Sequence, residues 1–143
     1  MVCSSVRKAF CGALFVWTLV VADLTAETPP SSKRFAAADS AEIPDFQRHV
    51  VPLLGRLGCN GRSCHGSFQG RGEFRLSLFG YDFGMDFEAL NANASSGNGR
   101  RVDRDEPARS LILQKPTLQL DHEGGMRFKP GSWEHQLLQR WIE

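Results

Sequence analysis

The sequence has little cysteine, little net charge and no recognisable catalytic pattern. Its 143 residues contain four cysteines, and the net charge of +1 suggests neither a nucleic-acid partner nor a membrane-surface partner. It contains no glycine-rich phosphate loop beside an expected strand, no Ser/His/Asp signature and no defensible pair of catalytic carboxylates. These absences leave no basis for predicting an enzyme.

The longest apolar run lies at the N-terminus. Residues 9–22 are almost entirely apolar and follow a stretch with two basic and no acidic residues. The run is shorter than the ~20 residues that a membrane anchor needs, and Ala26 is a small residue that suits a cleavage site. We therefore expect residues 1–26 to be a secretory signal peptide. The protein would then be exported, periplasmic or extracellular, with no stable membrane anchor after cleavage.

Signal cleavage would change the cysteine count. Cys3 and Cys11 lie within the expected signal, so the exported chain would keep only Cys59 and Cys64. Both remaining thiols then fall in one seven-residue stretch that ends with His65. A disulfide across so short a loop removes little entropy from the unfolded chain, which favours a cofactor over a plain disulfide.

The stretch from Cys59 to His65 has the order of groups that c-type haem attachment needs. Each cysteine sulfur adds to a haem vinyl group as a thioether, and the histidine after the second cysteine directs a ring nitrogen at the iron. Two residues usually separate the cysteines, whereas four do here. Gly61 gives the wider loop the backbone freedom to span both vinyl groups.

Two alternatives remain open at this point. One is a Cys59–Cys64 disulfide in an exported binding or interaction module that has no haem. The other is a zinc site made of Cys59, Cys64, His65 and His122. Zinc needs its four ligands at ~2.0–2.3 Å in a tetrahedron, and the adjacency of Cys64 and His65 makes that arrangement awkward.

The rest of the chain indicates one small helical domain. Residues 27–43 are rich in proline, serine and alanine and are expected to be a flexible leader. Residues 44–143 are expected to form a single domain. Its first helix should span residues 45–57, with Asp45 as the N-cap and Gly58 just beyond the end.

The first helix carries one apolar face, made of Phe46, Val50, Leu53, Leu54 and Leu57. Pro52 falls opposite this face and should bend the helix. His49 lies at the edge of the face and is interpreted as a structural histidine rather than a ligand.

The last helix is expected to begin after Ser132, its predicted N-cap, with Trp133, Leu137 and Trp141 on one face. We expect the first and last helices to pack together through Phe46, Val50, Leu53, Trp133, Leu137 and Trp141. His135 points away from that face and is expected to be solvated.

The segment between these helices is less regular. Alternating apolar residues over 74–78 predict a short strand or an extended segment. Short helices are expected over 86–90 and 106–113, with a loop at 91–101. The aromatic residues expected in the core are Phe79, Tyr81, Phe83 and Phe87.

Five short motifs follow one another along the chain. They are Cys59 to Gly66, Phe74-Arg75-Leu76-Ser77-Leu78-Phe79-Gly80, Gly99-Arg100-Arg101-Val102, His122-x-Gly-Gly-x-x-Phe128 and Gly131-Ser132-Trp133. Together they resemble the planctomycete-type cytochrome c domain, which is similar in having four residues between its haem cysteines. The resemblance covers about residues 46–142. Such domains usually begin much larger exported proteins, so this chain is expected to be either a truncated product or a stand-alone cytochrome.

The resemblance implies an all-α, cytochrome c-like domain with covalently bound haem c. Cys59 and Cys64 would be the thioether residues, and His65 the proximal axial ligand of the iron. The function it implies is one-electron transfer outside the cytoplasm, with a redox partner that is unknown. No enzymatic activity is expected of this domain.

The sixth ligand has to come from elsewhere in the chain. His122 and Met126 are the candidates because both lie in one glycine-flanked loop, and Met85 is a weaker third. His122 belongs to a segment that matches the family, whereas position 126 is variable there. We therefore predict axial ligation by His65 and His122, with Met126 as the second choice. Arginines that could hold the haem propionates are Arg100, Arg101 and Arg127, each of which could equally be a solvated loop residue.

Overall fold

The computed structural model describes residues 27–94 and 99–143. Over these ranges the chain is helical and forms no strand, only isolated bridges between Arg71 and Phe74 and between Asn93 and Arg100. The α-helices are α1 (Ser31–Arg34), α2 (Val51–Arg56), α3 (Phe83–Asn91), α4 (Leu111–Gln114) and α5 (Trp133–Ile142). Three further helical turns are the π-helical η1 (Phe46–Val50) and the 3₁₀-helical η2 (Leu78–Gly80) and η3 (Pro107–Arg109). The all-α prediction is confirmed for this part of the chain.

The predicted signal peptide, with Cys3 and Cys11, lies outside the described residues. Within the described ranges, no helix combines the length and apolar character that crossing a membrane requires.

The predicted first helix over 45–57 is present as two connected pieces, η1 and α2. Asp45 caps it as expected, because its carboxylate accepts a hydrogen bond from the backbone N–H of Arg48 at 2.7 Å. Pro52 is exposed at the start of α2. Because Pro52 has no N–H, it cannot continue the hydrogen bonding of the preceding turn, and the wider π-helical turn η1 lies directly before it.

The end of α2 positions the first cysteine. Gly58 has a φ of +76°, and its N–H donates to the Gly55 carbonyl at 3.0 Å. The N–H of Cys59 donates to the Leu54 carbonyl at 2.9 Å. This pair of bonds is a Schellman motif, so the predicted helix stop at Gly58 is confirmed and the backbone of Cys59 is tied to α2.

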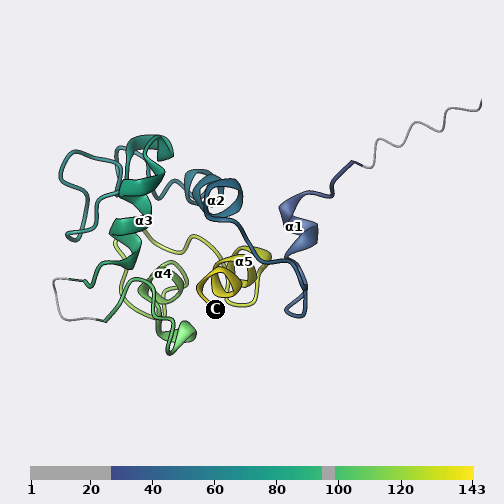
Figure 1. The fold of residues 1–143 in the computed structure, drawn as a ribbon. Coiled ribbons are helices and arrows are strands. Elements are labelled where there is room, and N and C mark those ends of the chain that lie inside the picture. Colours follow the sequence, from purple (N-terminus) through teal and green to yellow (C-terminus); the bar gives the residue numbers. More distant parts are fainter. Residues whose placement is uncertain (1–26, 95–98) are drawn as a thin grey trace, which may run out of the picture.

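The last helix packs against the first as predicted, because α5 contacts η1. α5 lies near the middle of the molecule (Figure 1). Val50, Leu53 and Leu137 are buried together in the core. Phe46 stacks on Trp141 at the edge of this core, with ring centroids 5.4 Å apart and an interplanar angle of 29°. The remaining buried core residues are Phe35, Leu54, Leu76, Leu90, Val102, Ile112, Leu113, Phe128, Leu138 and Ile142.

The four aromatic residues in and between η2 and α3 do not belong to the core, so the prediction that they would be buried there is wrong. Phe79 and Tyr81 are 77% and 73% exposed, and Phe83 and Phe87 are also exposed. Phe79 has a φ of +58°, which turns the short η2 segment away from the core. The buried residues of α3 are Asp86 and Leu90.

Other expectations for the middle and the C-terminal part need correction. Of the two structures predicted for residues 74–78, no strand forms, and residues 75–77 lie outside helices, with Ser77 extended. The expected helix over 86–90 is longer, since α3 spans Phe83–Asn91. Ser132 stands at the N-cap position of α5, but its hydroxyl makes no capping bond. His135 is half-buried rather than solvated, with its ring 6.3 Å from that of Phe128. Burial lowers the pKa of His135.

The segment 27–43, expected to be a leader, contributes to the fold. It contains α1, and Phe35 directly after α1 is fully buried in the core. The Phe35 ring lies 5.3 Å from the His49 ring, edge to face. His49 Nδ1 accepts a hydrogen bond from the Asp45 N–H at 2.8 Å. The folded part therefore extends N-terminally of residue 44, and His49 has the structural role that its position in the sequence predicts.

Candidate functional site

The loop from Cys59 to Gly66 is closed by its own backbone. The His65 N–H donates to the Cys59 carbonyl at 2.9 Å, which returns the chain to the end of α2. Inside the loop, the N–H groups of Cys64 and Gly66 both donate to the Gly61 carbonyl at 3.0 Å. The four residues between the cysteines are thus taken up in a compact turn. Both thiols and the imidazole consequently belong to one small structural unit.

Gly66 is required for this closure. A Cβ at position 66 would lie 2.0 Å from the Asn60 carbonyl oxygen, which no side chain can tolerate. Asn60 is itself 2% exposed, and its side-chain amide has no hydrogen-bond partner in the described structure. The loop therefore has no room for a side chain at position 66.

His65 is anchored by the segment that follows it. Its Nδ1 lies 3.0 Å from the Phe74 carbonyl and 3.1 Å from the Arg71 carbonyl. Because a carbonyl oxygen only accepts, Nδ1 carries the proton, and Nε2 is the nitrogen with a free lone pair. The Phe74 ring packs 4.6 Å from the imidazole. Burial lowers the pKa of His65 and favours the neutral ring that a metal requires.

His122 has the same tautomer for a similar reason. Its Nδ1 lies 2.9 Å from the Gly125 carbonyl, so Nδ1 donates and Nε2 is free. The backbone passes close under this ring, since a Cβ on Gly124 would lie 2.8 Å from His122 Cε1. Gly124 therefore permits a close approach of the backbone to the His122 ring.

The structure brings His65 and His122 together from two distant parts of the chain. Their ring centroids are 6.4 Å apart, and the two ring planes differ by only 14°. The two rings are thus nearly parallel, and because each Nδ1 is fixed to a backbone carbonyl, each Nε2 is left available to a metal ion.

Cys59 and Cys64 are free, half-buried thiols. Burial raises the pKa of the Cys59 thiol to about 11, although the positive charge of Arg127 acts in the opposite direction. A thiol with this pKa is protonated near neutral pH. In the described ranges, no three His, Cys, Asp or Glu side chains converge as a metal site.

One of the three candidate arginines lies at this site. Arg127 Nη2 approaches Cys64 Sγ at 3.8 Å, and Nη1 approaches the Leu57 carbonyl at 3.4 Å. Arg101 instead donates to four backbone carbonyls, those of Glu73, Ala89, Ala92 and Asn93. Arg100 is exposed and pairs with Asp105. Only Arg127 is therefore placed to act on a group attached to Cys64.

The two methionine candidates are less well placed than His122. Met126 is 51% exposed and follows Gly125 in the same loop. Met85 is in the first turn of α3, where its backbone N–H donates to the Asp82 carboxylate.

Sequence reasoning missed the residues that hold the site together. His65 is held by the backbone carbonyls of Arg71 and Phe74. Every residue has such a carbonyl, so the residue types at these positions do not predict the contact. The buried amide of Asn60 was passed over as a loop residue. The glycines at 70 and 72 were the one available signal that the chain turns back toward His65 here.

Comparisons with protein-family models, with curated proteins and with solved structures gave no match.

Proposed function

We propose that this chain is a c-type cytochrome that carries one electron at a time outside the cytoplasm. Cys59 and Cys64 would hold haem through thioether bonds, with His65 and His122 as the axial ligands. The observation that carries the proposal is the pair of parallel imidazoles 6.4 Å apart, each with its Nδ1 bonded to a backbone carbonyl.

The spacing of the two rings fits an iron between them. A metal–imidazole distance of about 2 Å on each side would place the two ring centroids roughly 6 to 6.5 Å apart. The bonds to Phe74 and Gly125 carbonyls leave Nε2 of each histidine available. Cys64 directly precedes His65, so a group attached to that sulfur is held next to the imidazole. The donor set and its arrangement therefore suit haem better than zinc.

Each residue has a distinct role in this proposal. The bound haem supplies an iron that alternates between the ferric and ferrous states. His65 and His122 would both bind the iron, which would leave no place there for a substrate and would make the chain an electron carrier rather than an enzyme. Arg127 lies beside Cys64, and its positive charge would favour the ferrous state. The carbonyls that hold Nδ1 of each histidine raise its basicity as a ligand.

The finer parts of the proposal rest on the sequence. The cytochrome c-like fold, the membership of the planctomycete-type family and export through residues 1–26 follow from the resemblance and from the N-terminal pattern. The helical architecture agrees with the all-α class, and the motif directly follows the end of a capped helix.

Covalent attachment is the direct test. Expressed with haem-attachment machinery and then denatured, the protein should retain haem on a gel, and Cys59→Ser with Cys64→Ser should lose it. Arg104→Ser, an exposed site distant in sequence from the motif, serves as the control and should keep its haem. A colourless, folded wild-type protein with a Cys59–Cys64 disulfide would reject the proposal in favour of a non-haem module.

A further inference from the structure

The chain around the haem loop is rich in arginine. Holding the cofactor does not explain this positive charge. The chain from Phe46 to Tyr81 contains five arginines and one glutamate, a local charge of +4, whereas the whole protein carries only +1. The positive charge is therefore concentrated in the segment of the sequence that contains the site. The five arginines are Arg48, Arg56, Arg62, Arg71 and Arg75.

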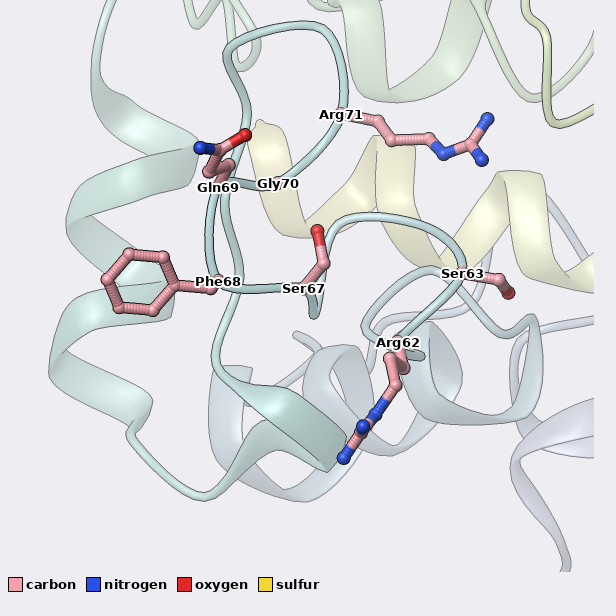
Figure 2. A pocket seen from close by; sticks show the side chains of 7 residues that line it. All are labelled: Arg62, Ser63, Ser67, Phe68, Gln69, Gly70 and Arg71. Atoms are coloured by element: carbon pink, nitrogen blue, oxygen red, sulfur yellow. The ribbon is translucent and has the colours of Figure 1, made fainter.

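The face that this segment forms has at its centre a shallow hollow of about 480 Å³ built by the haem loop itself. Arg62 and Ser63, which lie between the two cysteines, form one wall (Figure 2). Residues 67–71, which follow His65, form the other wall. The Arg71 carbonyl also contacts His65 Nδ1 at 3.1 Å. Anything seated here lies against both the thioether loop and the support of the proximal histidine.

The side chains on this face are exposed and largely unneutralised. Phe68 is 85% exposed, and the Arg75 guanidinium lies 5.3 Å from its ring. Arg71 has one exposed ion pair, with Glu123 at 3.6 Å. Within the described ranges, no carboxylate forms an ion pair with Arg62 or Arg75. An exposed large aromatic side chain beside unpaired arginines is typical of the composition of protein interfaces.

We propose that this face, defined by Arg62, Phe68, Arg71 and Arg75, docks an acidic redox protein and lets electrons enter or leave at the haem loop. Arg62 and Arg71 extend to different sides of the hollow (Figure 2). The cations are thus spread over a surface, which matches several carboxylates of a protein partner better than one small anion. The inference rests on the proposed function, because it concerns transfer to and from a bound haem.

The test measures electron transfer from the reduced holoprotein to a small acidic blue-copper protein. The rate constant should fall at least about fivefold between roughly 10 mM and 200 mM ionic strength, because salt screens an attraction between opposite charges. Arg62→Glu should lower the low-salt rate constant at least about fivefold. Arg75→Glu should act in the same direction and tests the face independently if Arg62→Glu impairs haem attachment.

Lys33→Glu is the matched control, since it changes the net charge by the same amount as Arg62→Glu. Lys33 is exposed on α1, which lies at the opposite side of the molecule from the chain that connects α2 to α3 (Figure 1). Its low-salt rate constant should change less than about twofold. Equal effects of Lys33→Glu and Arg62→Glu would show that net charge alone matters, and would overturn the proposal.

Two further results would also overturn it. One is a rate constant that does not respond to salt. The other is Arg62-dependent binding to phosphatidylserine vesicles with unchanged transfer to the copper protein, which would make this face a membrane contact. A wild-type chain that never acquires haem would instead contradict the proposed function, so the two failures are distinguishable.

Discussion

His65 and His122 each bond a backbone carbonyl through Nδ1, but they are held by different amounts of structure. His65 is bonded through its ring to the carbonyls of Arg71 and Phe74, and its own backbone N–H and carbonyl are both used, by Cys59 and Leu76. Its support therefore comes from two stretches of chain, at residue 59 and over residues 71–76. The ring of His122 has one anchor, the Gly125 carbonyl, three residues further along its own loop.

If the two histidines bind iron as proposed, this difference divides the site into a permanent half at His65 and an exchangeable half at His122. Moving His65 would require breaking bonds that also close the loop between the cysteines. Moving His122 requires only a rearrangement within a short turn that contains Gly124 and Gly125. Local openings of low cost are drawn from such weakly anchored segments. We expect the proximal ligand to be lost only with the fold, and the distal ligand to be lost without it.

The largest expected effect on stability comes from disrupting the loop from Cys59 to Gly66. Gly66→Ala places a methyl group 2.0 Å from the Asn60 carbonyl oxygen, and the surrounding loop has no room to yield. We expect a loss of about 4 kcal/mol or more in the free energy of unfolding, with little haem attached. Denaturant unfolding and the haem content of the purified protein measure both effects.

Gly72→Ala is the control for this substitution. Gly72 has a φ of +59°, but a Cβ there has no atom within 4 Å. Only the backbone strain of a left-handed alanine remains, which costs about 1 to 2 kcal/mol. If the two variants lose the same stability, the loop is not packed as tightly as the structure has it.

The next largest effect comes from removing the distal ligand. His122→Ala deletes one imidazole but leaves the motif loop and the support of His65 intact. We expect full covalent attachment of haem, less than about 1 kcal/mol of lost stability in the chain itself, and a high-spin iron that binds added imidazole. Electronic absorption and paramagnetic resonance spectra report the spin state.

His65→Ala provides the opposite case. It removes the ring that contacts Phe74 and Arg71. The iron would lose a ligand, and the segment over 66–76 would lose the side chain that anchors it. We expect lower haem content and lower stability than in His122→Ala. Equal behaviour of the two variants would contradict the division into a permanent and an exchangeable half.

A smaller effect is the dependence of the free energy of unfolding on pH. It separates acid unfolding of the whole domain from release of His122. Burial lowers the pKa of His135, and the pKa of His49 is also lowered, mainly by burial and then by the charge of Arg34. The unfolded chain therefore binds protons more readily than the folded chain below about pH 6.5. Stability should fall as the pH drops from about 6.5 toward the lowered values, and remain flat above that range.

His135→Phe tests this origin. It removes one titrating ring and a buried Nδ1 that has no partner in the described structure. We expect stability to rise by about 1 kcal/mol near neutral pH and to fall less steeply below pH 6.5. The spin-state change that reports loss of His122 should keep its midpoint, because His135 lies on α5. A midpoint that moves together with unfolding would mean that both ligands leave as the fold opens.

The sequence predicts the parts of this site that depend on residue identity and short spacing. The cap at Asp45, the stop at Gly58 and the loop from Cys59 to His65 could all be predicted, because each is a local pattern. Proximity of His122 to His65 was proposed from a motif and is present in the structure. Sequence patterns do not specify which backbone carbonyls meet a ring.

The errors have physical causes as well. The aromatic residues after Leu78 were predicted to be buried because they are apolar, but Phe79 adopts a positive φ and the chain turns outward there. His135 was predicted to be solvated because helical periodicity placed it off the apolar face. Phe128, from the loop before α5, covers that side and buries it. Both outcomes depend on tertiary contacts that no window of sequence contains.

The smallest expected effect is that of Met126→Leu, and it sharpens the comparison by being nearly silent. Met126 is 51% exposed, and leucine has a similar volume, so the stability should change by less than about 1 kcal/mol. The Gly125 carbonyl that orients His122 belongs to the backbone and is unaffected by the side chain at position 126. The spin state and the redox potential should therefore match those of the wild type. If the ferric wild type instead shows a near-infrared sulfur-to-iron band that Met126→Leu abolishes, the distal ligand is Met126. The weakly anchored half of the site would then be a thioether, and the parallel approach of His122 to His65 would have no role in binding iron.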